Sequence, residues 1–172
     1  MELLELTEST KKLFGIDEIS ELGSALRSAL ESHDESIMQS FCDMVDGDLS
    51  KDWLQMIYQY NCADRKEKKQ DYTPKCLADF MGRLVGDADT VVDMCAGSGA
   101  LIIQKWNRSK DQKFRAYEID ENVIPYLLFN LTIRNIQAIV YRADVLNDEV
   151  YEQWSIQKGE KYGRVSRVKS AI

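Results

Sequence analysis

Apolar residues recur at helical spacing through the first third of the chain. Leu22, Leu26 and Leu30 are spaced four residues apart, which places them on one face of a helix. Comparable apolar stripes precede and follow them, and no alternation typical of a strand interrupts them. The pattern predicts an all-helical N-terminal segment over residues 1–70, with Ser50 as a candidate N-cap of its last helix.

A polar, charged connector over residues 63–71 separates this segment from a further amphipathic stretch. Thr73 is a residue type favoured at N-caps, and Pro74 suits the first turn of a helix. The sequence therefore predicts a helix over residues 75–85, which begins the second part of the chain.

From residue 89 the pattern changes to short apolar runs that alternate with amphipathic stretches. Such an order predicts a parallel sheet with right-handed crossovers, and hence a partial Rossmann-like α/β fold. We expect residues 71–150 to form this half-domain and residues 151–172 to form a tail, where weak alternation at 162–168 allows one extra strand. The expected strands are 90–94, 114–119 and 138–141, and the expected helices between them are 100–106 and 122–133.

The composition narrows the possible chemistry. Of 172 residues, 44% are hydrophobic and 30% are charged, which is typical of a globular protein, and no apolar window is long enough for a membrane span. The single histidine, His33, excludes a histidine-cluster metal site, and we expect no metal centre. The four cysteines form no C-x-x-C pair, which favours reduced thiols and a cytoplasmic location. The net charge of −7 argues against strong binding of nucleic acid by the chain alone.

Three acids mark the ends of the three predicted strands, namely Asp93, Glu118 and Asp144. Ligands of such sheets bind at the carboxyl ends of the strands, where a carboxylate can bind ribose hydroxyls. Gly97 and Gly99 would let the backbone turn sharply and approach a ligand, although G-x-G alone also fits a purely structural turn. An acid before the glycines disfavours phosphate and suits a cationic amine. Adenosine joined to an amino-acid tail describes S-adenosylmethionine.

Four short motifs carry a family resemblance. Residues 93–99 (Asp-Met-Cys-Ala-Gly-Ser-Gly) resemble the first cofactor motif of class I methyltransferases, in its DNA adenine methyltransferase form. Residues 71–74 (Asp-Tyr-Thr-Pro) are similar to the element that precedes this motif in modification subunits of type I restriction systems. Residues 117–120 (Tyr-Glu-Ile-Asp) and 143–146 (Ala-Asp-Val-Leu) resemble the ribose-binding and adenine-contacting motifs. The resemblance to N6-adenine DNA methyltransferases covers residues 71–146.

The resemblance implies a binding site for S-adenosylmethionine and assigns each residue a role within it. The methionine end would be lined by Tyr72, Thr73 and Pro74, and the cofactor turn would comprise Asp93, Met94, Cys95, Ala96, Gly97 and Gly99. Glu118 would bind the ribose hydroxyls, with Ile119 and Asp120 beside the adenine, and Asp144 and Val145 would contact the base.

One departure from the family pattern limits these expectations. The family's catalytic motif contains two adjacent prolines, whereas this sequence has only Pro74 and Pro125, so we assign no catalytic residue and leave activity of the chain alone open. Residues 145–172 show no clear fourth strand. We expect a truncated form or one that acts in DNA modification with a partner, either a complementing methyltransferase half or a subunit that contacts DNA. The alternatives are a non-catalytic interaction or oligomerisation module, and a methyltransferase with another substrate.

Overall fold

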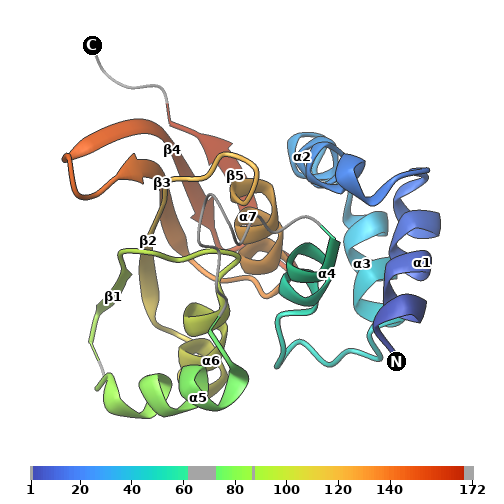
Figure 1. The fold of residues 1–172 in the computed structure, drawn as a ribbon. Helices are drawn as coiled ribbons and strands as arrows, with labels where there is room; N and C mark the ends of the chain where they lie inside the picture. Colours follow the sequence, from blue (N-terminus) through green and yellow to red (C-terminus); the bar gives the residue numbers. More distant parts are fainter. Residues whose placement is uncertain (1, 62–72, 87, 169–172) are drawn as a thin grey trace.

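The computed structural model describes residues 2–61, 73–86 and 88–168 (Figure 1). Its first range contains a short 3-10 helix and four α-helices, which confirms the helical prediction for these residues. Asp52 rather than Ser50 caps the last of them, because its Oδ1 accepts a hydrogen bond from the backbone N–H of Gln55 at 2.8 Å. The helices are α1 (Leu3–Phe14), α2 (Leu22–Glu31), α3 (Glu35–Met44) and α4 (Trp53–Asn61).

The second part of the chain forms one five-stranded sheet in the order β1-β2-β3-β4-β5. The first three strands are parallel, as predicted, whereas β4 and β5 are added as antiparallel neighbours beyond β3. The strands are β1 (Thr90–Asp93), β2 (Lys113–Glu118), β3 (Ala138–Asp144), β4 (Glu149–Gln157) and β5 (Arg164–Arg167). The accompanying helices are α5 (Lys75–Leu84), α6 (Ala100–Arg108) and α7 (Ile124–Ile133).

The expectation of three strands and no clear fourth strand was therefore wrong. Strand β4 crosses the boundary that we predicted at residue 150, whereas β5 lies within residues 162–168, where the sequence allowed one extra strand. The signal of β4 is weak because only Trp154 and Ile156 are buried along it, while its first three residues are exposed. A strand with so few inward-facing apolar residues shows little of the alternation on which sequence analysis depends.

Helix α7 forms the centre of the molecule. All ten of its residues are buried, because the sheet lies on one side of it and helices of the first range lie on the other (Figure 1). The ring of Phe129 makes edge-to-face contacts with Phe14 at 5.8 Å and with Phe41 at 5.4 Å between centroids. The core therefore runs without interruption from the N-terminal helices to the sheet.

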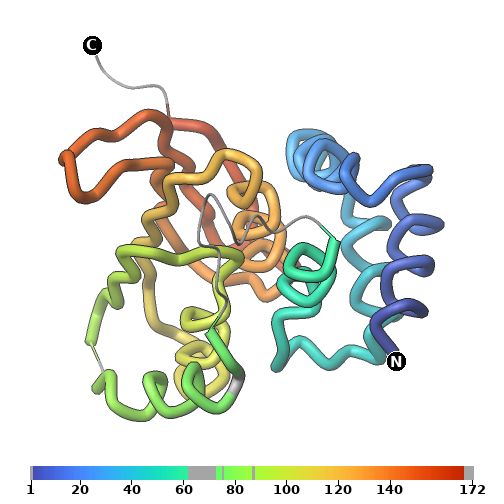
Figure 2. The backbone as a smooth tube through the Cα atoms, viewed as in Figure 1, coloured from blue at the N-terminus to red at the C-terminus, as the bar shows by residue number. Residues whose placement is uncertain are grey.

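Helices cover one face of the sheet in the described structure. Along β2, Phe114 and Ala116 are buried whereas Arg115 is exposed, and buried residues alternate with partly exposed ones along β3. Figure 2 shows α5 and α6 together near β1, on the opposite side of the molecule from α1–α3. A doubly wound sheet has helices on both faces, so the fold is α/β with only part of that plan. None of the helices in the described ranges is both long and apolar enough to cross a membrane.

Candidate functional site

The site begins at a sharp turn between β1 and α6. Gly97 and Gly99 have φ angles of +53° and +103°, which favour glycine over residues with a side chain. A Cβ atom at Gly99 would lie 3.1 Å from Cδ1 of Leu127, so the turn packs closely against α7. A Cβ at Gly97 would meet no atom within 4 Å. The backbone at Gly97 therefore borders open space that a ligand can enter.

Hydrogen bonds join this turn to the end of β2. The backbone N–H of Gly97 donates to Oε2 of Glu118 at 2.9 Å, and that of Asp120 donates to Oε1 at 2.8 Å. The N–H of Ala96 donates to the carbonyl of Tyr117 at 2.8 Å. Burial raises the pKa of Glu118, against the effect of the backbone donors. Each oxygen of its carboxylate has a lone pair beyond these bonds, so Glu118 can still accept from ligand hydroxyls.

One carboxylate oxygen of Asp93 has no hydrogen-bond partner among the described residues. Its Oδ1 accepts a bond from the N–H of Cys95 at 3.2 Å, whereas its Oδ2 is buried and has no partner among the described residues. Burial raises the pKa of Asp93. Buried acceptors without a donor are costly and uncommon in proteins, so Oδ2 is suited to an N–H donor from a ligand, such as an ammonium group.

The other predicted residues around the turn are more exposed. Met94 and Ile119 are 51% and 55% accessible. Cys95 is a free, exposed thiol whose pKa is raised by desolvation and then by the acids Asp93 and Glu118. A raised pKa keeps sulfur in its weakly nucleophilic thiol form, so Cys95 is poorly suited to act as a nucleophile, and its place in a cofactor site stays a prediction.

Asp120 and Asp144 use their carboxylates locally. Oδ1 of Asp120 accepts from the backbone and side chain of Asn122, both at 3.0 Å. Asp144 accepts from the N–H of Leu146 at 3.0 Å and from the side chain of Asn147 at 2.9 Å, and the bonds to Asn147 hold its pKa below the ordinary value. The end of β3 is thus a turn into β4, and the role of Asp144 and of the partly buried Val145 in contacting a base stays a prediction.

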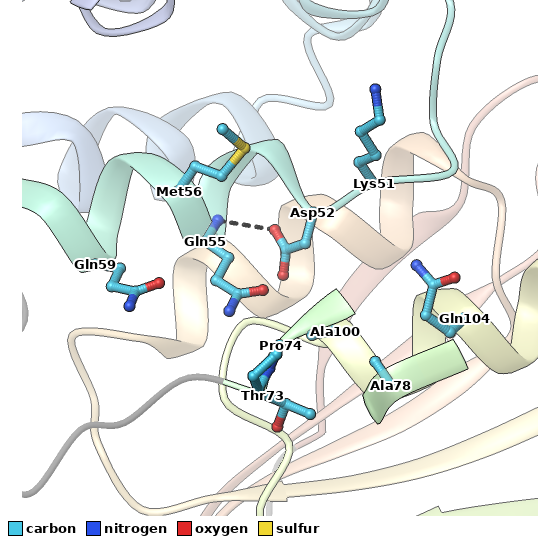
Figure 3. A pocket seen from close by; sticks show the side chains of 10 residues that line it. All are labelled: Lys51, Asp52, Gln55, Met56, Gln59, Thr73, Pro74, Ala78, Ala100 and Gln104. Atoms are coloured by element: carbon cyan, nitrogen blue, oxygen red, sulfur yellow. Dashed lines mark hydrogen bonds between the residues drawn. The ribbon is translucent and has the colours of Figure 1, made fainter. Parts of the chain in front are cut away.

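Thr73 and Pro74 line a cavity that Ala100, directly after the turn, also lines, and their role at the methionine end of a cofactor stays a prediction. The N-cap of α5 is Pro74, in an extended conformation with ψ of 144°, so the prediction that Thr73 caps this helix was wrong. Both residues line a cavity of about 380 Å³, toward which Gln55 and Gln59 extend from α4 (Figure 3). Tyr72 lies outside the described residues. The remaining lining residues are Lys51, Asp52, Met56, Ala78, Ala100 and Gln104.

A buried polar cluster that includes Ser98 of the turn was missed by the sequence analysis. It consists of Asp52, Ser98, Asn130 and Arg134, all of which are buried. Asn130 and Arg134 are four residues apart on a largely apolar helix, and this spacing is the signal that could have drawn attention to them. Asp52 had no comparable signal, because it contacts the others only in the folded structure.

Comparison with protein-family models assigns the chain to a family. A protein-family model described as N-6 DNA Methylase matches residues 47–161, which is more than half of the chain. The match begins before α4 and extends beyond β4, so it includes Asp52, the glycine turn and Glu118. Comparisons with curated proteins and with solved structures gave no match. The chain therefore belongs to the N-6 DNA methylase family.

Proposed function

We propose that this chain binds S-adenosylmethionine at the carboxyl ends of β1 and β2 and takes part in N6-adenine methylation of DNA. The observation that supports this most is the turn itself, where Glu118 accepts from the open backbone at Gly97 and Asp93 accepts from the backbone of Cys95. Members of the N-6 DNA methylase family use this cofactor. An adenosine with a cationic amino-acid tail fits this set of groups. They are a carboxylate bound by backbone donors, a second carboxylate with an unpaired oxygen, and a glycine backbone.

The residues of the turn would divide the binding between them. Glu118 would accept hydrogen bonds from the ribose hydroxyls, and Oδ2 of Asp93 would accept from the ammonium group of the tail. Gly97 would allow close approach of the cofactor to the backbone. The bound cofactor supplies a methyl group on a sulfonium centre, and the chain's own residues hold and orient it.

Transfer of the methyl group also requires an acceptor amine held against the cofactor. Enzymes that modify DNA bases extrude the base into a pocket, and the family motif for this step contains adjacent prolines. Pro74 and Pro125 are the two prolines of this sequence. We therefore propose that the base-binding residues come from outside these 172 residues, and that DNA is reached through a partner subunit in a modification system.

Titration calorimetry with S-adenosylmethionine and with its demethylated product tests the proposal. Glu118→Gln should weaken binding about tenfold or more, because its amide group would face the N–H donors of Gly97 and Asp120. Glu121→Gln is the matched control, because Glu121 is an exposed neighbour that pairs with Arg142 at 3.2 Å. No heat from the unaltered chain at millimolar ligand would contradict the proposal.

The outer edge of β1 favours a second candidate function, an interaction module. β1 is the edge strand of the sheet, and a groove of about 150 Å³ lies between it and helices α5 and α6. Val92 on this strand, Met94 just after it and Phe80 on α5 are each more than half exposed. An unpaired strand edge beside apolar side chains is a template for pairing with another chain. We propose that a second copy pairs here across a two-fold axis, since an antiparallel edge pair is self-complementary.

Light scattering after size-exclusion chromatography tests this candidate function, because it measures whether the chain is a dimer or a monomer. Val92→Lys should convert a dimer to a monomer, because it places a charge in the proposed interface. Val150→Lys is the matched control, since Val150 is 57% exposed on β4, away from β1. An unaltered chain that stays monomeric at high concentration would rule out the dimer.

A further inference from the structure

The carboxylate of Asp52 lies inside the molecule and connects three separate parts of the chain. Its Oδ2 accepts a hydrogen bond from the hydroxyl of Ser98 at 2.7 Å. Its Oδ1 accepts from the side-chain amide of Asn130 and from the backbone N–H of Gln55, both at 2.8 Å. The N-terminal helical segment, the glycine turn and α7 therefore meet at one carboxylate.

Arg134 completes the cluster and balances its charge. Its Nη1 donates to Oδ1 of Asn130 at 2.9 Å, while Nε donates to the carbonyl of Leu49 at 2.9 Å and Nη2 to that of Lys51 at 2.6 Å. Burial lowers the pKa of Arg134 to about 10, so the side chain remains a cation at neutral pH. The guanidinium thus holds the backbone just before α4 and opposes the charge of Asp52.

The glycine turn is held from two sides. Glu118 binds the N–H of Gly97 on the ligand side, as described above. Other elements hold Ser98, since its hydroxyl donates to Asp52 before α4 and its carbonyl accepts from Asn130 on α7 at 2.9 Å. Glycines flank Ser98, and glycine is the residue with the greatest backbone freedom. Bonds from outside the turn are therefore needed to keep one conformation.

We infer that Asp52 is a positioning residue for the cofactor turn, so that cofactor affinity depends on the helical segment that carries it. The inference rests on the proposed function and assigns a role in it to a residue from outside the sheet. A binding site gains affinity when its contacting groups are already ordered before the ligand arrives. The family match begins at residue 47, so Asp52 lies within the matched part of the chain.

Two variants and one control test this role. Asp52→Asn removes the carboxylate that accepts from the Ser98 hydroxyl and replaces it with a neutral amide. Ser98→Ala removes the hydroxyl that donates to Asp52 and keeps the opposite charges of Asp52 and Arg134. Trp53→Phe is the control, because the Trp53 indole donates to the carbonyl of Asp48 at 2.6 Å and makes no bond to the turn. By calorimetry, each test variant should bind S-adenosylmethionine about tenfold more weakly, and the control within about twofold of the unaltered chain. The double variant should bind no more weakly than the weaker single variant, since both singles remove one shared bond.

Amide hydrogen exchange without ligand separates positioning from general stability. In both test variants the amides of residues 96–99 should exchange faster, while those of the control should not. Equal exchange of the turn in all three variants would overturn the inference. If the unaltered chain binds cofactor and the test variants bind it equally well, the inference fails and the proposed function stands. If the unaltered chain binds no cofactor, the proposed function fails, and the affinity part of the inference fails with it.

Discussion

Two acids with different surroundings form the proposed site. Glu118 accepts two backbone hydrogen bonds, whereas Asp93 accepts one and keeps a buried oxygen without a partner among the described residues. Burial raises the pKa of both carboxyl groups. A buried ionised acid that lacks donors destabilises the fold, and such perturbed acids concentrate at functional sites. The residue that would bind the cofactor's cationic amine therefore carries a stability cost when no ligand is present.

Asp93→Asn tests that cost through its pH dependence. The folded-state pKa of Asp93 lies above the ordinary value of 3.8, so the native protein loses stability relative to the variant as pH rises through that pKa. The free energy of unfolding of the variant minus that of the native protein should therefore become more positive from about pH 3 to pH 7, measured by urea unfolding. Asp144→Asn is the opposite control, because the lowered pKa of Asp144 stabilises the native protein as pH rises. If the difference changed with pH in the same direction for both variants, this account would be contradicted.

Helix α7 shows how a single element can be central to the whole fold. Its sequence is apolar on nearly every side, which is typical of a helix that is buried all round. The sheet and the N-terminal helices supply the two surfaces that bury it, and Phe129 meets Phe14 and Phe41 on the N-terminal side. Because the two layers leave no side of α7 facing solvent, nearly all of its residues are apolar.

Phe129→Ala should therefore destabilise the protein strongly. Removing a fully buried phenylalanine costs about 3–5 kcal/mol through lost burial and the cavity left behind. Urea unfolding should show a loss of that size in the free energy of unfolding. Leu146→Ala serves as the control, because Leu146 is 93% exposed and its truncation should change stability by less than about 0.5 kcal/mol. A loss below about 1 kcal/mol for Phe129→Ala would show that α7 repacks.

The N-terminal helices and the sheet share one hydrophobic core. Tyr58 on α4 packs edge to face against Tyr126 on α7, with centroids 5.0 Å apart. The buried cluster continues from Leu6 on α1 to Ile156 on β4. A core of this kind favours cooperative unfolding, because neither part keeps its buried surface without the other. The affinity of the turn for a ligand and the integrity of the helical segment are then linked.

The whole chain should unfold in a single transition. A variant with Trp106→Phe and Trp154→Phe keeps Trp53 as its one tryptophan, so its fluorescence reports on the helical segment. In urea, the midpoint of that fluorescence should coincide with the midpoint of far-ultraviolet circular dichroism, which reports on the whole chain. An earlier midpoint for Trp53 would indicate that the helical segment unfolds independently.

The sequence predicted those features that depend on neighbouring residues. Asp93 and Glu118 come at the ends of β1 and β2 as expected, and Gly97 and Gly99 adopt the positive φ angles that a sharp turn requires. The β4 strand was not predicted, because its stability comes from pairing with β3 rather than from its own weak alternation. Threonine is a residue type favoured at N-caps, but the N-cap position of α5 is occupied by Pro74 rather than by Thr73.

By itself, the sequence determined the family motifs, the parallel start of the sheet and the acids at its strand ends, because these are local in the chain. Only the tertiary structure decided that Oδ2 of Asp93 lacks a donor among the described residues, and that Asp52 supports the turn from the helical segment. Asp52 and Ser98 are 46 positions apart. A contact between residues so distant leaves no periodic pattern in a single sequence, because it depends on how complete elements pack together.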